Sequence, residues 1–184
     1  RLFVQDKVYD AFAEKLAAKV KQLKVGNGFD DGVVQGPLID QQALAKVEEH
    51  VADALVQGAK VMTGGKRHSL GGTYFEPTVL TDVKRTMKIF TEETFGPVAP
   101  LFRFKDEKEV IEMANDTEFG LSGSIFTRDV GRALRVSRAV EAGNLSINSH
   151  SAVRYWTPFG GFKQSGLGRE LGPDAPHSFT EVKN

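Results

Sequence analysis

Residues 97–149 read "PVAPLFRFKDEKEVIEMANDTEFGLSGSIFTRDVGRALRVSRAVEAGNLSINS", an alternation of elements that decides the fold class. Short apolar runs predict strands, and apolar residues spaced three or four apart predict helices between them. Strands that alternate with helices of about ten residues predict an α/β fold with a parallel, helix-covered sheet. The predicted elements are a strand at 97–105, a helix at 106–116 with Val110, Ile111 and Ala114 inward, a strand at 122–127, a helix at 129–143 with Val130, Ala133, Leu134 and Val140 on one side, and a strand at 144–149.

The preceding residues continue the same pattern. A strand over Leu2-Phe3-Val4 leads into a helix, and a second helix ends near Gly58. A strand follows at 59–65, and 73–83 alternates like an extended segment in which Pro77 argues against a central place in a sheet. The residues predicted to face the core are Val8, Phe12, Leu16, Val20 and Leu23 on the first helix, and Leu44, Val47, Val51 and Leu55 on the second.

Composition excludes several classes of protein. The 184 residues contain 24 basic and 24 acidic side chains, so there is no electrostatic footprint for nucleic acid or an anionic membrane. No apolar run is long enough to span a bilayer. Cysteine is absent, which excludes a disulfide, a zinc-thiolate site and a cysteine nucleophile within these residues and is compatible with a cytoplasmic protein. Because Leu2-Phe3-Val4 already resembles a buried strand, we expect the chain to be a piece of a longer protein.

Local patterns alone do not define a catalyst. In the glycine-rich stretch 157–172, Leu167 stands where a phosphate-binding loop requires lysine, so a tight loop is the simpler interpretation. The four histidines have no ligand spacing, and we predict no metal site. In "NSHS", 148–151, no nucleophile elbow presents a serine. Glu92 and Glu93 before Phe95 are, by themselves, typical of a solvated turn with a buried phenylalanine.

Four stretches in combination carry a family resemblance. "EETFGPV" at 92–98, "NDTEFGLSGSIFT" at 115–127, "AGNLSIN" at 142–148 and "PFGGFKQSGLGRELG", followed by "FTEVK", resemble in order and spacing the catalytic domain of NAD(P)-dependent aldehyde dehydrogenases. The resemblance covers residues 1–184 and implies a catalytic-domain portion without the nucleotide-binding domain. The family's nucleophilic cysteine would precede Arg1, and its general-base glutamate would also lie outside the chain. The resemblance therefore implies an oxidoreductase fragment that is inactive alone.

The resemblance implies a chemistry and a set of partners. A thiolate attacks the aldehyde to form a thiohemiacetal, hydride passes to NAD or NADP, and water releases the acid. The partners implied are a small-molecule aldehyde and further copies of the same protein, as a homodimer or homotetramer. The glycine-rich loop becomes part of the aldehyde tunnel rather than a phosphate site.

Family motifs place the cofactor at three residues of this sequence. Glu93 matches a glutamate that accepts hydrogen bonds from the nicotinamide ribose, and Phe95 matches a residue that limits the swing of the ring. Leu121 matches a position beside the ring, and a buried core leucine is the alternative.

Other matches concern the aldehyde. Phe159 would wall the tunnel, and Asn148 would support the site from below. Glu170 matches a carboxylate on a water and proton path, and pairing with Arg169 or Lys163 is the structural alternative. The tunnel mouth would include Ser151, Val153 and Arg154.

The substrate class has two readings in the sequence. Residues 1–20, 47–61 and 92–104 look most like succinate-semialdehyde dehydrogenases, whereas 148–174 looks more like general or amino-aldehyde dehydrogenases. Val153 and Arg154 stand where the first subfamily has a carboxylate-binding serine. We expect an enzyme acting on succinate semialdehyde or a similar polar aldehyde; the alternatives are an amino-aldehyde or broad-specificity enzyme and, from another class, a non-catalytic α/β binding module.

Overall fold

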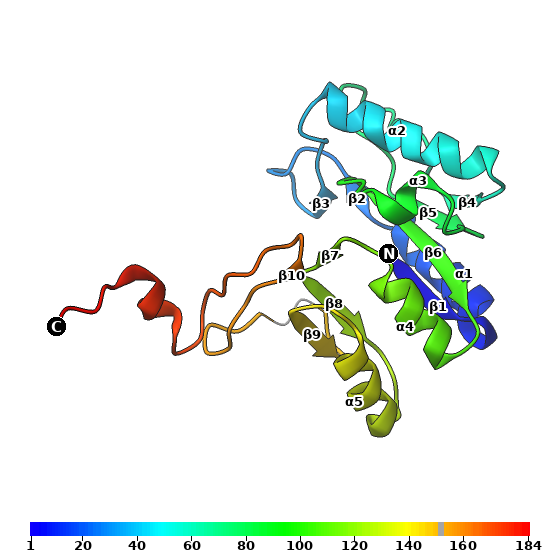
Figure 1. The fold of residues 1–184 in the computed structure, drawn as a ribbon. Helices are drawn as coiled ribbons and strands as arrows, with labels where there is room; N and C mark the ends of the chain where they lie inside the picture. Colours follow the sequence, from blue (N-terminus) through cyan, green and yellow to red (C-terminus); the bar gives the residue numbers. More distant parts are fainter. Residues whose placement is uncertain (151–152) are drawn as a thin grey trace. The chain divides into compact units, whose positions relative to one another are not determined.

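The computed structural model describes residues 1–150 and 153–184, which form two compact units, Arg1–Lys105 and Asp106–Asn184 (Figure 1). The first contains β1 (Leu2–Gln5), α1 (Asp6–Val20), β2 (Lys24–Val25), β3 (Val33–Gln35), α2 (Gln41–Val56), β4 (Lys60–Thr63), β5 (Thr78–Thr81), α3 (Lys88–Thr91) and β6 (Val98–Phe104). The second contains α4 (Glu107–Asn115), β7 (Phe119–Gly120), β8 (Ser122–Ile125), α5 (Val130–Ala139), β9 (Asn144–Ile147), β10 (Phe162–Lys163) and the 3₁₀ helix η1 (Ala175–Phe179).

The predicted α/β fold with parallel strands and covering helices is confirmed. In the first unit the strand order is β1-β6-β5-β4, with β6 parallel to both β1 and β5 and only β4 antiparallel. In the second unit β8 is parallel to β9, in register from Ser122–Asn144 to Ile125–Ile147. Among the described residues these strands belong to separate sheets rather than one.

Helix α1 forms as predicted, but the prediction of its buried face is confirmed only in part: Leu16 and Val20 pack half-buried against the core, and the other predicted residues do not. Tyr9, Ala13 and Ala17 are buried, whereas Val8 and Phe12 are exposed. The physical reason lies at Tyr9, whose hydroxyl donates to the carbonyl oxygen of Leu101 (3.0 Å) and accepts from the amide of Asp82 (3.0 Å). Burial of this side chain raises the pKa of the Tyr9 phenol. The two small alanines then let the helix lie close to the sheet.

Helix α2 follows the predicted pattern more closely. Leu44, Val47 and Val51 are buried, while Leu55 at the C-terminal end is exposed. The carboxylate of Asp40 caps the N-terminus by accepting from the amide of Ala43 (2.7 Å). Gly58 follows the C-cap in the left-handed region, as expected of a helix stop.

The expectation from Pro77 was wrong. β5 lies between β4 and β6 and all four of its residues are buried, so it is an interior strand. The strand begins at Thr78, one residue after the proline. Pro77 therefore removes no hydrogen bond from the ladder, because proline is tolerated where a strand starts.

The second unit begins with two capped helices. Asp106 and Asp129 cap α4 and α5 by accepting from backbone amides three residues on. Met113 is the buried residue of α4, with Val110, Ile111 and Ala114 only half-buried. On α5, Ala133 and Val136 are buried; the inward placement of Val130 and Leu134 was wrong, since both are exposed.

The C-terminal segment is short and mostly exposed. η1 is a single 3₁₀ turn with Pro176 in its first positions, where the ring costs no helical hydrogen bond. Within the described ranges, none of the helices is long and apolar enough to cross a membrane.

Candidate functional site

Two of the three predicted cofactor residues, Glu93 and Phe95, lie in the first unit, in the loop between α3 and β6. Glu93 is exposed, and the Phe95 ring is 80% exposed. Phe95 has φ of 51°, in the left-handed region that a bulky residue occupies only where its surroundings hold it. The loop therefore presents an acceptor-only carboxylate and an aromatic ring on the surface of this unit, two residues apart in the sequence.

The loop is tied to the sheet on one side and to α2 on the other. The amide of Thr78 donates to the carbonyl of Pro97 (2.8 Å), which fixes the point where the loop enters β6. A Cβ at Gly96 would come within 2.3 Å of Val47 Cγ2 on α2. Only glycine fits there without a shift, so the "FGP" motif is explained by close packing against a helix.

In the second unit the glycine-rich stretch forms a tight loop in which segments of backbone cross each other at close range. Phe159 and Glu170 make an antiparallel bridge, with each amide donating to the other's carbonyl at 2.7 Å. A Cβ at Gly143 would come within 1.9 Å of the carbonyl oxygen of Gly160, and one at Gly160 within 2.2 Å of the carbonyl oxygen of Gly168. These glycines permit the chain segments to touch, in agreement with a tight loop.

The structural alternative for Glu170 is not what the structure shows. Lys163 forms its ion pair with Glu141 (2.5 Å) and donates to the carbonyls of Asn115 and Thr117. The Arg169 guanidinium donates to the carbonyl of Gly161 (2.8 Å) and stacks over the Phe162 ring. Both cations are engaged elsewhere, and Glu170 lies exposed with its backbone fixed beside Phe159.

We predict that Gly160→Ala destabilises this crossing by about 1–3 kcal/mol, because the atom nearest to the added methyl group is a backbone oxygen, which cannot move aside as a flexible side chain can. The matched control is Gly168→Ala, since a Cβ there meets nothing within 4 Å. Thermal unfolding of the two variants checks the prediction. Equal melting temperatures would mean that the loop yields at Gly160 without cost.

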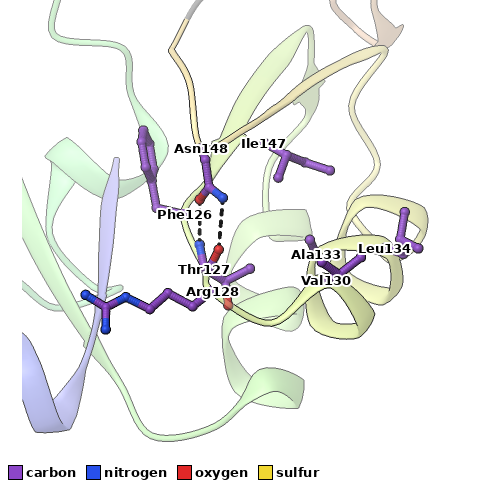
Figure 2. A pocket seen from close by; sticks show the side chains of 8 residues that line it. All are labelled: Phe126, Thr127, Arg128, Val130, Ala133, Leu134, Ile147 and Asn148. Atoms are coloured by element: carbon purple, nitrogen blue, oxygen red, sulfur yellow. Dashed lines mark hydrogen bonds between the residues drawn. The ribbon is translucent and has the colours of Figure 1, made fainter.

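Leu121 and Asn148 occupy defined places in the second unit. Leu121 is 43% exposed, so the alternative of a buried core leucine is not seen, and its carbonyl accepts from the amide of Asn144 (3.0 Å). Asn148, with φ of 51°, spans the turn after β8: its side-chain oxygen accepts from the Thr127 amide (2.9 Å) and its nitrogen donates to the Thr127 carbonyl (3.0 Å), as Figure 2 shows. This is a structural role.

An open apolar hollow of about 620 Å³ lies at the same end of β8 and β9 (Figure 2). Of the site residues singled out from the sequence it includes Asn148, and it also includes three α5 residues that we expected in the core, Val130, Ala133 and Leu134. None of the described residues expected to contact cofactor or aldehyde lines this hollow. Its lining consists of Phe126, Thr127, Arg128, Val130, Ala133, Leu134, Ile147 and Asn148.

The residues predicted at the tunnel mouth are exposed where they are described. Ser151 lies outside the described residues. Val153 is exposed, and the Arg154 guanidinium donates to the carbonyl of Val153 (3.2 Å). The neighbouring Tyr155 and Trp156 rings pack edge-to-face on each other, with centroids 4.6 Å apart. Arg154 thus sits on an exposed turn, closed by Thr157 donating to its carbonyl.

Sequence reasoning missed one residue of the first unit, His50. It is fully buried on α2 and contacts both Glu92 and Thr94. A signal was present: His50 is a polar residue in the apolar stripe of Leu44, Val47 and Val51, three positions after Val47. Such a residue needs a hydrogen-bonding partner, which the spacing of histidines alone does not reveal.

The fold and the two loops define a class of protein, an α/β domain with glycine-bearing loops that expose a carboxylate and aromatic faces. The sequence model described as "Aldehyde dehydrogenase family" matches residues 1–184. The chain belongs to the aldehyde dehydrogenase family.

Relatives within the family agree with this. The chain is 55% identical over 183 residues to a succinate-semialdehyde dehydrogenase [NADP(+)] of Escherichia coli, and 54% identical over 183 residues to a 3-sulfolactaldehyde dehydrogenase of Pseudomonas putida. Both matches cover 100% of the chain but 38% of the relative, so the chain spans little more than a third of their length. The crystal structure of a succinate-semialdehyde dehydrogenase from Burkholderia pseudomallei matches with a TM-score of 0.95 at 55% identity, over 97% of this chain and 37% of that one.

Proposed function

We propose that the chain forms part of an NAD(P)⁺-dependent enzyme that oxidises a small aldehyde carrying an acidic group, such as succinate semialdehyde. The observation that carries this proposal is the loop with Glu93 and Phe95, where an exposed carboxylate and an exposed ring are held by a strained backbone and a glycine packed on α2. Two relatives, 55% and 54% identical to this chain, are named for aldehydes that bear a carboxylate or a sulfonate, which supports an acidic substrate.

The residues of this chain would bind and orient the cofactor and the aldehyde but would not supply the nucleophile. When bound, the nicotinamide accepts the hydride of the aldehyde. Glu93 would accept hydrogen bonds from the two ribose hydroxyls, which suits a carboxylate with no proton to donate. Phe95 would limit the swing of the nicotinamide ring, and Leu121 would lie beside that ring. The nucleophilic thiol and the general base would come from outside these residues.

The glycine-rich loop would contribute to the aldehyde side. Phe159 would exclude water from the tunnel. Glu170, fixed beside it by the backbone bridge, would support a path for water and protons. A cytoplasmic location and a homodimeric or homotetrameric assembly stay predictions from the resemblance.

The proposal is tested with the full-length protein that contains this chain. Formation of NADH or NADPH is measured with succinate semialdehyde, with a neutral aldehyde of similar length and with an amino-aldehyde. We expect kcat/KM to be highest for the acidic aldehyde. A preference for the amino-aldehyde would favour the second substrate class, and no NAD(P)H with any aldehyde would favour a non-catalytic α/β binding module.

Arg154 is the candidate anchor for the acidic group. Among the described residues, its exposed guanidinium donates to the carbonyl of the residue before it (3.2 Å), and it could bind a carboxylate in a bidentate manner. We predict that Arg154→Ala lowers kcat/KM for succinate semialdehyde about 10- to 100-fold, the loss of one charge-assisted contact. The neutral aldehyde should be affected far less. Equal losses on both aldehydes, or none on either, would remove Arg154 from the substrate site.

A further inference from the structure

His50 is a fully buried side chain whose two ring nitrogens both contact residues 92–96, in the loop between α3 and β6 that carries Glu93 and Phe95. Its Nδ1 lies 2.9 Å from the hydroxyl of Thr94, and its Nε2 lies 3.2 Å from a carboxylate oxygen of Glu92. The side chain has 0% exposure, whereas the Glu92 side chain is 53% exposed. A buried imidazole costs free energy unless both nitrogens find partners, and here the loop supplies both.

The chemistry of the partners decides the direction of these hydrogen bonds. A carboxylate only accepts, so Nε2 carries a proton and donates to Glu92. In the neutral imidazole Nδ1 then accepts the proton of the Thr94 hydroxyl, and one tautomer satisfies both contacts. The two bonds lie on either side of Glu93 in the sequence, so the imidazole spans the residue proposed to bind the ribose.

Helix α2 also fixes the approach to the loop. The amide of Lys88, at the start of α3, donates to the carboxylate of Asp53 (2.8 Å), and the Lys88 ammonium forms an ion pair with Glu49. His50 and Asp53 are three residues apart on α2, a spacing that places them on the same side of the helix, and Glu49 directly precedes His50. The helix therefore holds the segment from Lys88 to Thr94.

On the far side of Glu93, the same helix restrains the loop through packing. Val47 lies where a Cβ on Gly96 would stand, three residues before His50 on α2. Phe95, between Thr94 and Gly96, has positive φ. Contacts at Thr94 and at Gly96 thus bracket the residue with the strained backbone, and strain of this kind persists only where neighbours over-determine it.

We propose that His50 is a positioning residue, which sets the conformation of residues 92–96 so that Glu93 and Phe95 meet the nicotinamide ribose. This inference rests on the proposed function. In this proposal His50 contacts Glu92 and Thr94, and it touches neither cofactor nor aldehyde. Its imidazole is a rigid spacer with two polar ends, and an apolar side chain of similar size would leave the Thr94 hydroxyl and the Glu92 carboxylate without a partner on α2.

The experiment compares His50→Leu with Val51→Ala in the full-length protein. Val51 is equally buried on α2, but it faces a different hollow, with Glu48, Leu55 and Phe75. We expect both variants to lower the melting temperature, but only His50→Leu to raise the Kd for NAD(P)⁺, by about 5- to 20-fold. Thr94→Val should have the same effect as His50→Leu, and Thr94→Ser, which keeps the hydroxyl, should restore binding. Equal Kd values for His50→Leu and Val51→Ala would overturn the proposal.

A second readout separates this inference from the role of Glu93. Amide hydrogen exchange in the peptide covering 88–98 should speed up about tenfold or more in His50→Leu and stay unchanged in Val51→Ala. In a Glu93→Gln background, His50→Leu should add little to the loss of cofactor affinity, because the group it positions is already altered. If Glu93→Gln leaves the Kd unchanged, the proposed function fails while exchange still reports on His50. Unchanged exchange in His50→Leu overturns the positioning role whatever Glu93 does.

Discussion

We expect the 184-residue chain, purified alone, to produce no NAD(P)H from succinate semialdehyde. The chain contains no cysteine, so the thiol that the proposed mechanism requires for attack on the aldehyde is not among these residues. Removing the nucleophile of a well-studied protease costs about six decades in kcat while the rest of the site stays intact, and an effect of that size leaves no measurable turnover. The measurement is a sensitive fluorescence assay for NAD(P)H at high protein concentration.

The control for this prediction is the full-length protein with its nucleophilic cysteine replaced by alanine. That variant should be as inactive as the isolated chain, while binding of NAD(P)⁺ is kept. Steady NAD(P)H production by the isolated chain, in a preparation shown by mass spectrometry to lack longer species, would contradict the assignment of the chemistry to a residue outside these 184.

The second large effect is expected at Glu93. Glu93→Gln in the full-length protein keeps the shape of the side chain but replaces a charged acceptor by an amide. We predict that cofactor affinity or the rate of hydride transfer falls about 10- to 150-fold, which corresponds to about 1.5–3 kcal/mol for a hydrogen bond to a charged group. Stability should change little, because Glu93 is exposed.

The matched control for Glu93→Gln is Glu118→Gln, a change of the same kind at an exposed residue of the second unit. Cofactor binding and single-turnover hydride transfer are measured in both variants. If Glu93→Gln behaves like the control, the loop is a solvated turn and the carboxylate has no part in cofactor binding.

Strong periodicity explains which parts of the fold could be predicted. Helix α2 has an apolar stripe, an aspartate cap and a glycine stop, and these local signals agree with its final packing. Helix α1 has an apolar stripe too, but the position of its buried face was decided by Tyr9, which bonds to backbone groups of Leu101 and Asp82. No local pattern encodes partners that lie more than seventy residues away.

Pro77 and the α5 residues Val130 and Leu134 are cases in which a clear local pattern gave a wrong expectation. A proline within an extended run suggests an edge strand, yet the strand starts one residue later and lies inside the sheet. Val130 and Leu134 match a helical stripe, but in the described residues they line an open hollow. Periodicity predicts that a face is apolar and leaves open what covers it.

The candidate site was predictable as motifs rather than as geometry. The glycine stretch could be rejected as a phosphate loop from Leu167 alone, and Glu93 and Phe95 could be placed on one loop. The reason for Gly96 required the structure, because it depends on Val47 of a helix about fifty residues earlier. His50 was missed for the same reason: its role lies in contacts with Glu92 and Thr94, not in any spacing of histidines.

The most direct test of the account is a thermodynamic cycle between Glu93 and the cofactor. Isothermal titration of the full-length protein and its Glu93→Gln variant is carried out with NAD(P)⁺ and with an analogue that lacks the two hydroxyl groups of the nicotinamide ribose. We predict that Glu93→Gln weakens binding of NAD(P)⁺ by about tenfold or more but leaves binding of the analogue unchanged, since the groups that Glu93 contacts are then absent. Equal effects of the substitution on both ligands, or no effect on either, would contradict the claim that this loop binds the ribose.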